Sequence, residues 1–229
     1  MNGALAIFGR YPRLGEVKTR LQPFLGAEAC LALHQALLLD TVERTSGVNL
    51  KRFLYLAACS RKEGQKFAEE QGLPLCLELG IQKGENLGAR LWKAYQDVST
   101  QWDRVLFVGS DSPTLPTDFI EKAFLELEDH PIVLGPAEDG GYYLIGLSQP
   151  RQDLFSDIDW GTGEVLEQTK AKLNRDEYFL LPSWYDIDTV EDLTRLHRDL
   201  EHNPAGVPRR TQAWIRSIYP TLLRKPSEE

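Results

Sequence analysis

Short apolar runs alternate along the chain with longer segments in which apolar and polar positions are mixed. The run Val105–Val108 is uninterrupted, which favours a strand buried on both faces. Similar but shorter or less regular runs predict strands at Leu5–Phe8, Phe53–Ala58, Leu75–Leu79, Ile132–Leu134, Tyr142–Leu147 and Tyr178–Leu181. The mixed segments between them predict helices over Ala27–Arg44, Arg61–Gln71, Gly88–Val98, Asp118–Leu127, Glu164–Leu173 and Val190–Leu200.

The order of these elements predicts the fold class. Strands that alternate with helices form a mostly parallel sheet with helices on both faces, so we expect a single three-layer α/β/α domain with Val105–Val108 inside the sheet. Two strands around the turn GPAEDGG (residues 135–141) break the alternation and predict a small antiparallel excursion. We place this domain at residues 1–201, followed by a C-terminal tail at residues 202–229 with a short helix around Gln212–Ile218.

Composition narrows the class of protein. The 229 residues carry a formal net charge of −8, so an overall basic footprint for nucleic acid is absent. The three cysteines are widely spaced without a CxxC pattern, which indicates reduced thiols of a cytoplasmic protein. No apolar stretch reaches the length of a membrane span, and the apolar part of the first residues is too short for a signal peptide. We therefore expect neither a nucleic-acid partner nor a membrane span, and the oligomeric state stays open.

Acidic side chains follow two of the predicted strands. Asp111, between two serines, comes directly after the apolar run Val105–Val108, and ligands bind outside the carboxyl ends of such strands. An aspartate there can also simply turn the chain. In an extended segment Asp186 and Asp188 point to the same face and could approach Asp111. Converging carboxylates suit Mg²⁺, which usually takes one or two of them plus substrate phosphates.

The second acid of this pair has a competing interpretation. Asp188 or Thr189 could instead cap the helix that begins at Val190, which leaves Asp186 without a role. Which of Asp186 and Asp188 would be the second metal ligand therefore stays open at this point.

A basic loop follows the first predicted strand. The segment GRYPRLGEVKTRL (residues 9–21) concentrates cations in a protein of negative net charge. Lys18 offers a compact point charge and Arg20 a bidentate fork, and both suit phosphate oxygens. The segment matches neither the P-loop pattern nor GxGxxG. The alternative interpretation is a solvated basic surface loop.

The turn GPAEDGGYY (residues 135–143) combines acids with glycines. Gly140–Gly141 allows a close approach of backbone to a ligand. Glu138 and Asp139 could then accept hydrogen bonds from hydroxyl groups or act as a base. An ordinary hairpin turn explains the same residues, because Asp-Gly is a strong hairpin signal.

Two amide side chains lie in the loop IQKGENL (residues 81–87). Gln82 and Asn86 flank a glycine, and amides in such a place can bind a base edge or a sugar. A plain polar loop is the simpler interpretation of this stretch when it is taken alone.

Taken together, the stretches resemble one group of bacterial proteins. It belongs to the nucleotide-diphospho-sugar transferase superfamily with the glycosyltransferase A fold, and some of its members are linked to arsenosugar biosynthesis. The resemblance runs in order across residues 5–196. Its two departures are Arg10, where the group usually has Lys, and Gly161, where it usually has Ser. The matching stretches are FGRYPRLGEVKTRL (8–21), QKGENLGAR (82–90), GSDSPTLP (109–116), GPAEDGGYYLIGL (135–147), DWGT (159–162) and YDIDTVEDL (185–193).

The resemblance implies a catalytic domain that binds a nucleotide or nucleotide-sugar across the carboxyl edge of the sheet, with Mg²⁺ or Mn²⁺ as cofactor. Asp111 matches the acid of the group's metal-binding motif, and Asp188 is the second expected metal ligand. The phosphate- and nucleotide-binding set is Gly9, Arg10, Gly15, Lys18, Arg20, Gln82 and Asn86. The expected catalytic residues are Asp139 and Glu138, and the substrate-binding set is Gly140, Gly141, Tyr142 and Thr162.

The expected activity is glycosyl transfer from a nucleotide-diphospho-sugar to a small-molecule acceptor. The same superfamily includes the molybdenum-cofactor and phospholactate guanylyltransferases, so nucleotidyl transfer to a phosphorylated acceptor is the alternative. Both reactions need cations against departing phosphate oxygens. Residues 137–143 hold acids and no cation, which favours an acceptor with hydroxyl groups. A non-catalytic nucleotide-binding protein is the second alternative, and retention or inversion at the sugar stays open.

Overall fold

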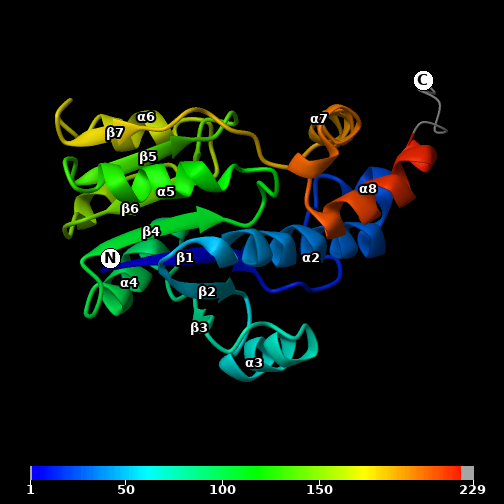
Figure 1. Cartoon of the computed structure of the whole chain (residues 1–229), viewed down its shortest axis with the longest axis horizontal. Coiled ribbons are helices and arrows are strands. Elements are labelled where there is room, and N and C mark those ends of the chain that lie inside the picture. Colours follow the sequence, from blue (N-terminus) through cyan, green and yellow to red (C-terminus); the bar gives the residue numbers. More distant parts are fainter. Residues whose placement is uncertain (1, 223–229) are drawn as a thin grey trace. The chain divides into compact units, whose positions relative to one another are not determined.

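The computed structural model describes residues 2–222. The chain forms two compact units, which we describe separately (Figure 1). The first contains the residues up to Tyr11, Gly47–Gly109 and Thr117–Tyr185. The second contains Pro12–Ser46, Ser110–Pro116 and the residues from Asp186 onward. The division of the chain at residue 201, expected from composition, stays a prediction.

The first unit is built on a seven-stranded sheet. Its strand order is β3-β2-β1-β4-β6-β5-β7. The strands are β1 (Gly3–Arg10), β2 (Lys51–Ala57), β3 (Glu78–Ile81), β4 (Arg104–Gly109), β5 (Ile132–Pro136), β6 (Tyr142–Leu147) and β7 (Tyr178–Leu180). Strand β6 pairs antiparallel with β4 and β5, and the other pairs are parallel. The predicted antiparallel excursion is thus confirmed.

Strand β4 is an interior strand, as the apolar run predicts. Its residues Val105–Val108 are at most 2% exposed, between β1 on one side and β6 on the other. Phe107 pairs with Ala6 of β1 and with Ile145 of β6, and all three contribute to one core. Alternate residues supply the opposite face, because successive side chains of a strand point to opposite sides.

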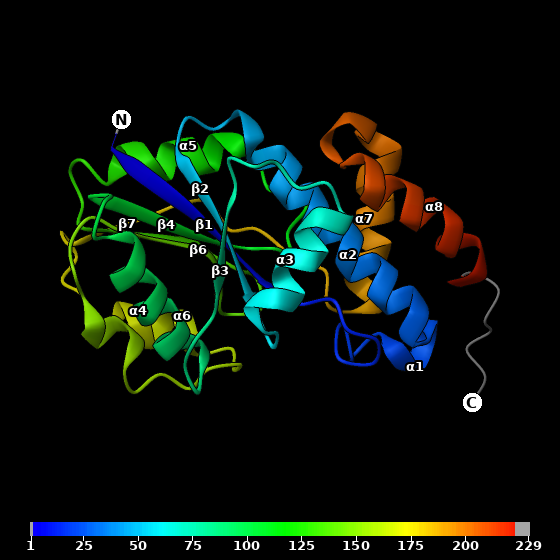
Figure 2. The same ribbon diagram turned by 90° about the horizontal axis from the view of Figure 1, so that it is seen from below.

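Helices cover both faces of this sheet. Figure 2 shows α5 on one face and α4 with α6 on the other. Leu91 and Tyr95 of α4 pack into the core that contains Phe107, and Gly3 of β1 lies directly under the ring of Phe124 of α5. The three-layer α/β/α class is confirmed. The helices of this unit are α3 (Arg61–Glu70), α4 (Leu87–Val98), α5 (Thr117–Glu126), α6 (Val165–Lys170) and the 3₁₀ turn η2 (Gln152–Phe155); a further turn, η1 (Thr45–Gly47), lies at the unit boundary.

Strand β3 begins three residues later than its sequence predicts. Leu75, the first residue of the predicted strand, is fully exposed. A turn closed by the Leu77 amide donating to the Pro74 carbonyl occupies these residues instead. The strand then continues through Gly80, where a β-carbon would lie 2.5 Å from the ring of Tyr55. The glycine that weakens the apolar pattern is therefore what lets β3 pair beside Tyr55.

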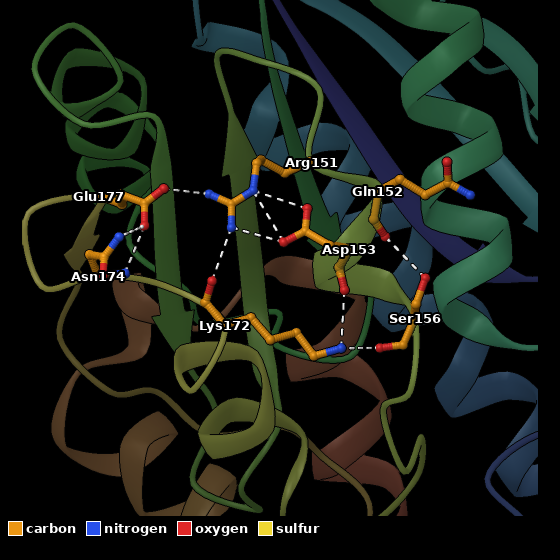
Figure 3. Close-up of polar contacts among 7 residues, drawn as sticks. All are labelled: Arg151, Gln152, Asp153, Ser156, Lys172, Asn174 and Glu177. Atoms are coloured by element: carbon orange, nitrogen blue, oxygen red, sulfur yellow. Dashed lines mark hydrogen bonds and ion pairs between the residues drawn. The ribbon is translucent and has the colours of Figure 1, made fainter.

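A clamp of charged residues joins two loops of the first unit (Figure 3). The Arg151 guanidinium donates to both carboxylate oxygens of Asp153, to Glu177 at 2.6 Å and to the Lys172 carbonyl at 3.0 Å. The Lys172 ammonium donates to the carbonyls of Asp153 and Ser156. We call Arg151, Asp153, Lys172 and Glu177 the Arg151 clamp.

The second unit consists of helices. Buried Asp40 of α2 accepts hydrogen bonds from the amide and hydroxyl of Thr211, both at 2.7 Å, and Trp214 donates to the Ala29 carbonyl. These contacts fix α8 against α2. The short helix expected around Gln212–Ile218 lies within α8. The helices are α1 (Gln22–Leu25), α2 (Ala27–Arg44), α7 (Val190–His202), the turn η3 (Pro204–Gly206) and α8 (Arg209–Leu222).

Among the helices that the structure describes, none combines the length and the apolar character needed to cross a bilayer.

Candidate functional site

Lys18, Asp111 and Asp188 meet in the second unit, and we call them the Lys18 site. The Lys18 ammonium nitrogen lies 2.7 Å from Asp111 Oδ1 and donates to Asp188 Oδ1 at 2.9 Å. The Lys18 side chain is 3% exposed, whereas each carboxylate is 41% exposed. Both acids therefore converge on one buried cation and keep an open side.

The fold positions the two acids by backbone contacts. The Ile187 amide donates to the Asp111 carbonyl at 3.0 Å, which joins the segment after β4 to the segment before α7. Thr189 is the N-cap of α7 and forms a capping box with Asp192. The capping role considered for Asp188 is thus filled by Thr189, so the Asp188 carboxylate is available to Lys18.

Asp186 has a different partner. It accepts a hydrogen bond from the Ser112 hydroxyl at 2.9 Å. Asp188, and not Asp186, shares the Lys18 ammonium with Asp111. The geometry of the second unit thus favours Asp188 as the partner of Asp111, the pairing that the sequence alone left open.

Lys18 has an unusual backbone conformation. Its φ is +48°, in the left-handed region that residues with a β-carbon seldom adopt. Such a residue costs on the order of 1–3 kcal/mol and persists where its surroundings hold it. The two ion pairs of the ammonium, and the Leu21 amide that donates to the Lys18 carbonyl, hold it here. In the same loop Gly15 has φ +80° and Arg20 is exposed.

Lys18 and Asp111 each favour the charged form of the other. Burial alone would lower the pKa of the Lys18 ammonium, but Asp111 and Asp188 outweigh burial and raise that pKa. Burial likewise opposes ionisation of Asp111, yet Lys18 and His34 lower the pKa of its carboxyl. Lys18 therefore stays protonated and Asp111 ionised at neutral pH.

His34 is a neighbour that the sequence did not reveal. It lies on α2, is 4% exposed, and its Nδ1 is 4.0 Å from Asp111 Oδ1. Asp111 Oδ1 is buried and meets Lys18 as an ion pair without a well-directed hydrogen bond. The available signal was a histidine among the buried apolar residues Leu33 and Leu37 of one helix. A buried imidazole more often completes a core than a site, so this signal was weak.

The two carboxylates of the Lys18 site are ligands of the type that hard cations such as Mg²⁺ prefer. The point that their Oδ1 atoms share is occupied by the Lys18 ammonium, so a metal would have to use the open side of the two acids. No group of three or more metal-ligating side chains occurs among the described residues. Substrate phosphates and water would therefore have to complete the coordination of a metal held by Asp111 and Asp188.

The predicted nucleotide-binding amides belong to the first unit and serve its local structure. Gln82 donates to the carbonyls of Gly9 and Tyr55, both at 3.0 Å. The Asn86 side chain caps α4 by accepting from the Ala89 amide at 2.9 Å. These bonds explain both amides without a ligand. The nucleotide-binding roles expected for Gly9, Arg10, Gly15, Arg20, Gln82 and Asn86 stay predictions.

The turn with the expected catalytic acids is tightly closed. The Gly141 amide donates to Asp139 Oδ1 at 2.9 Å, and the Gly140 amide donates to the Ala137 carbonyl. Gly140 has φ +90°, and a β-carbon there would lie 2.1 Å from the Gly163 carbonyl oxygen. The turn therefore packs against the turn that contains Thr162. The roles expected for Glu138, Asp139, Gly140, Gly141, Tyr142 and Thr162 stay predictions.

The sheet order and the helices on both faces define an α/β fold of the nucleotide-diphospho-sugar transferase type. A protein of Desulfovibrio desulfuricans G20, provisionally described as such a transferase, is 30% identical, with a TM-score of 0.89 over 97% of each chain. The chain belongs to the family described as "Uncharacterized protein conserved in bacteria (DUF2064)", which matches residues 42–162. The resemblance inferred from the sequence motifs is thus confirmed at the level of the family.

More distant structures share the fold alone. A cytidylyltransferase from Leptospira borgpetersenii serovar Hardjo-bovis is 14% identical, with a TM-score of 0.57 over 100% of this chain and 99% of that one. The inositol-1-phosphate CTP transferase from T. maritima is 13% identical, with a TM-score of 0.55 over 91% and 98%.

Proposed function

We propose that this protein is a metal-dependent transferase that moves a glycosyl group from a nucleotide-diphospho-sugar to a hydroxyl group of a small acceptor. The observation that carries the proposal is the Lys18 site, in which one buried ammonium is flanked by two half-open carboxylates. A fixed cation beside acids that suit a metal matches the needs of a reaction whose leaving group is a diphosphate.

The charge to be stabilised lies on the departing phosphate oxygens. Lys18 is a point charge whose raised pKa keeps it protonated at neutral pH, so it can donate to one of these oxygens. Asp111 and Asp188 would hold Mg²⁺ or Mn²⁺, which supplies Lewis-acid stabilisation of the same charge. Binding the diphosphate requires Lys18 to share its donors between the carboxylates and the substrate.

His34 acts in this proposal as a positioning residue. Its buried ring lies beside Asp111 Oδ1 and favours the ionised carboxylate. An Asp111 carboxylate that stays ionised keeps one oxygen for Lys18, while its exposed side stays open to a metal.

Nucleotidyl transfer to a phosphorylated acceptor is the second candidate. The Lys18 site serves that reaction equally well, because pyrophosphate is also an anionic leaving group. The cytidylyltransferase and the inositol-1-phosphate CTP transferase that share the fold are named for such chemistry. Glycosyl transfer ranks first because the relative at 30% identity is described for sugar nucleotides and because residues 137–143 carry no cation.

The test compares two donor classes. The full chain with Mg²⁺ or Mn²⁺ is incubated with a panel of nucleotide-diphospho-sugars, or with nucleoside triphosphates and a sugar phosphate. We expect nucleoside diphosphate release from a sugar donor, lost in Asp111→Asn and retained in Asp118→Asn, an exposed acid of α5. Pyrophosphate release without turnover of any sugar donor would establish the second candidate. Nucleotide binding without either product would indicate a non-catalytic binding protein.

A further inference from the structure

The first unit contains a cavity to which the proposed function assigns no role. Its volume is about 490 Å³, and it lies between α4 and the segment around η2. Its lining includes Lys83, Trp92, Lys93, Gln96, Gln152 and Trp160. In Figure 3 the Gln152 side chain extends away from the Arg151 clamp, so the clamp holds the backbone of this segment and leaves that amide for the cavity.

Three of the sequence motifs meet beside this cavity. A β-carbon at Gly88 would lie 2.6 Å from Trp160 Cζ2 and 2.4 Å from the Phe155 carbonyl oxygen. Only glycine lets the indole lie directly on the start of α4. Tyr142 packs edge-on against the same indole, with ring centroids 6.3 Å apart. The stretches QKGENLGAR, DWGT and GPAEDGGYY thus fix one tryptophan from two sides.

The aromatic wall continues along α4. Trp92 stacks on Tyr95 with ring centroids 5.4 Å apart and lies 6.3 Å from Phe155. Trp92 and Trp160 are both partly exposed and both line the cavity. Rigid indole rings with an accessible surface suit the apolar face of a sugar ring, and they lose little conformational entropy on binding.

Polar groups complete the lining. The side-chain amides of Gln96 and Gln152 can each donate to and accept from hydroxyl groups. Lys83 is exposed, whereas the Lys93 ammonium lies 3.6 Å from Asp97 Oδ1 as an ion pair. Lys83 is therefore the more available cation. Asp157 is the one acid in the described lining. Because Asp97 offsets the charge of Lys93, Lys83 is the cation of the lining that would attract a negatively charged group of a ligand.

We propose that this cavity binds an anionic sugar, a monosaccharide that carries a carboxylate or a phosphate group. The tryptophans would contact the ring, the two glutamines its hydroxyl groups, and Lys83 the charged group. This binding does not depend on the proposed function, which concerns the Lys18 site.

The experiment measures binding to the full chain by titration calorimetry with three probes, glucuronate, glucose 6-phosphate and glucose. We expect at least one of the two anions to bind about tenfold more tightly than glucose, the worth of one charge-assisted contact. Lys83→Gln should remove that advantage. Lys66→Gln, an exposed lysine of α3 outside the cavity, should leave it unchanged.

A second variant addresses the aromatic wall. Gly88→Ala forces Trp160 to move, so we expect all three sugars to bind more weakly than to the original chain. If Gly88→Ala does not fold, Lys83→Gln alone decides the matter. Failure of both anions to bind, or equal affinity in Lys83→Gln, would overturn the inference.

The two proposals fail separately. Nucleoside diphosphate release from sugar donors without binding of any anionic sugar would remove the cavity inference and leave the proposed function standing. Binding of an anionic sugar, lost in Lys83→Gln, in a protein that turns over no nucleotide-sugar would do the reverse.

Discussion

The Arg151 clamp and the Lys18 site each place a cation between two acids, yet they differ in how that cation is held. In the clamp, Arg151 uses its fork on Asp153 and Glu177 and adds a backbone carbonyl, while Glu177 also accepts from Asn174. Asp153 is 53% exposed and the two acids of the Lys18 site are 41% exposed, so open carboxylates do not separate the two groups. The cations do, because the Lys18 side chain is 3% exposed on a left-handed backbone and that of Arg151 is 18% exposed. A buried charge on a strained backbone indicates a functional role.

The largest expected effect separates the two groups by activity. Asp111→Asn removes one of the two carboxylates that would hold the metal ion, and stabilisation of the leaving group by a metal ion is worth several kcal/mol. Each 1.36 kcal/mol is tenfold in rate, so we expect kcat to fall by at least about a hundredfold. Asp153→Asn in the clamp should retain turnover. Product release is the measurement. An equal loss of activity in the two variants would show that the Lys18 site and the clamp do not differ in function.

The second effect concerns how far Mg²⁺ restores the stability that a variant of the Lys18 site loses, compared with a variant of the clamp. Lys18→Met leaves two carboxylates facing each other, and the free energy of unfolding should fall. The loss should be smaller than the about 3–5 kcal/mol of a fully buried pair, because both acids are 41% exposed. Mg²⁺ should restore part of the loss by replacing the ammonium between the acids. Urea unfolding with and without Mg²⁺ measures this, and a loss that Mg²⁺ leaves unchanged would argue against a metal site.

The third effect concerns the clamp itself. Arg151→Met removes the donor to the Lys172 carbonyl and to the Asp153 carboxylate, so we expect the free energy of unfolding to fall. The loss should be smaller than in Lys18→Met, because Asp153 is open to water. Mg²⁺ should not restore it, and nucleotide affinity should stay the same in the folded variant. Weakened nucleotide binding at temperatures where the variant is fully folded would show that the clamp is more than structural.

The smallest effect is on acid stability. The hydrogen bond from Arg151 lowers the pKa of the Asp153 carboxyl. A group with a lowered pKa stabilises the fold above its unfolded pKa of about 3.9, and this contribution is lost as pH falls through the lower folded value. Asp153→Asn should therefore lose less stability than the original chain below about pH 4. The difference is small because Asp153 is 53% exposed. Thermal unfolding as a function of pH measures it, and parallel curves would contradict it.

The sequence predicts the frame of the sheet better than its polar contacts. The run Val105–Val108 predicts β4 because burial on both faces requires continuous apolar residues. Gln82 and Asn86 are predicted ligand groups, and the sequence does not show that they also bond to carbonyls and an amide of their own unit. Such partners come from other strands and turns, which periodicity does not report.

The contacts of the Lys18 site are a second feature that the sequence predicts only in part. The sequence indicates cations near residue 18 and acids at Asp111 and Asp188, but not that an ammonium lies between the acids. The backbone of Lys18 is left-handed at this contact, and buried His34 lies beside Asp111. Neither feature has a signature in a single sequence.

The residues of the Lys18 site are translated at widely separated times. Lys18 and Asp188 are 170 residues apart, and the second unit is assembled from three separate stretches of chain. A growing polypeptide emerges from its N-terminus, so Lys18 is made early and Asp188 arrives only when most of the chain has been translated. The ion pair between Lys18 and Asp188 cannot form before that moment, whereas Asp111 has already been translated. A ribosome-bound fragment that ends before Asp186 therefore lacks the complete charge arrangement, and the chain gains it only as its last helices emerge.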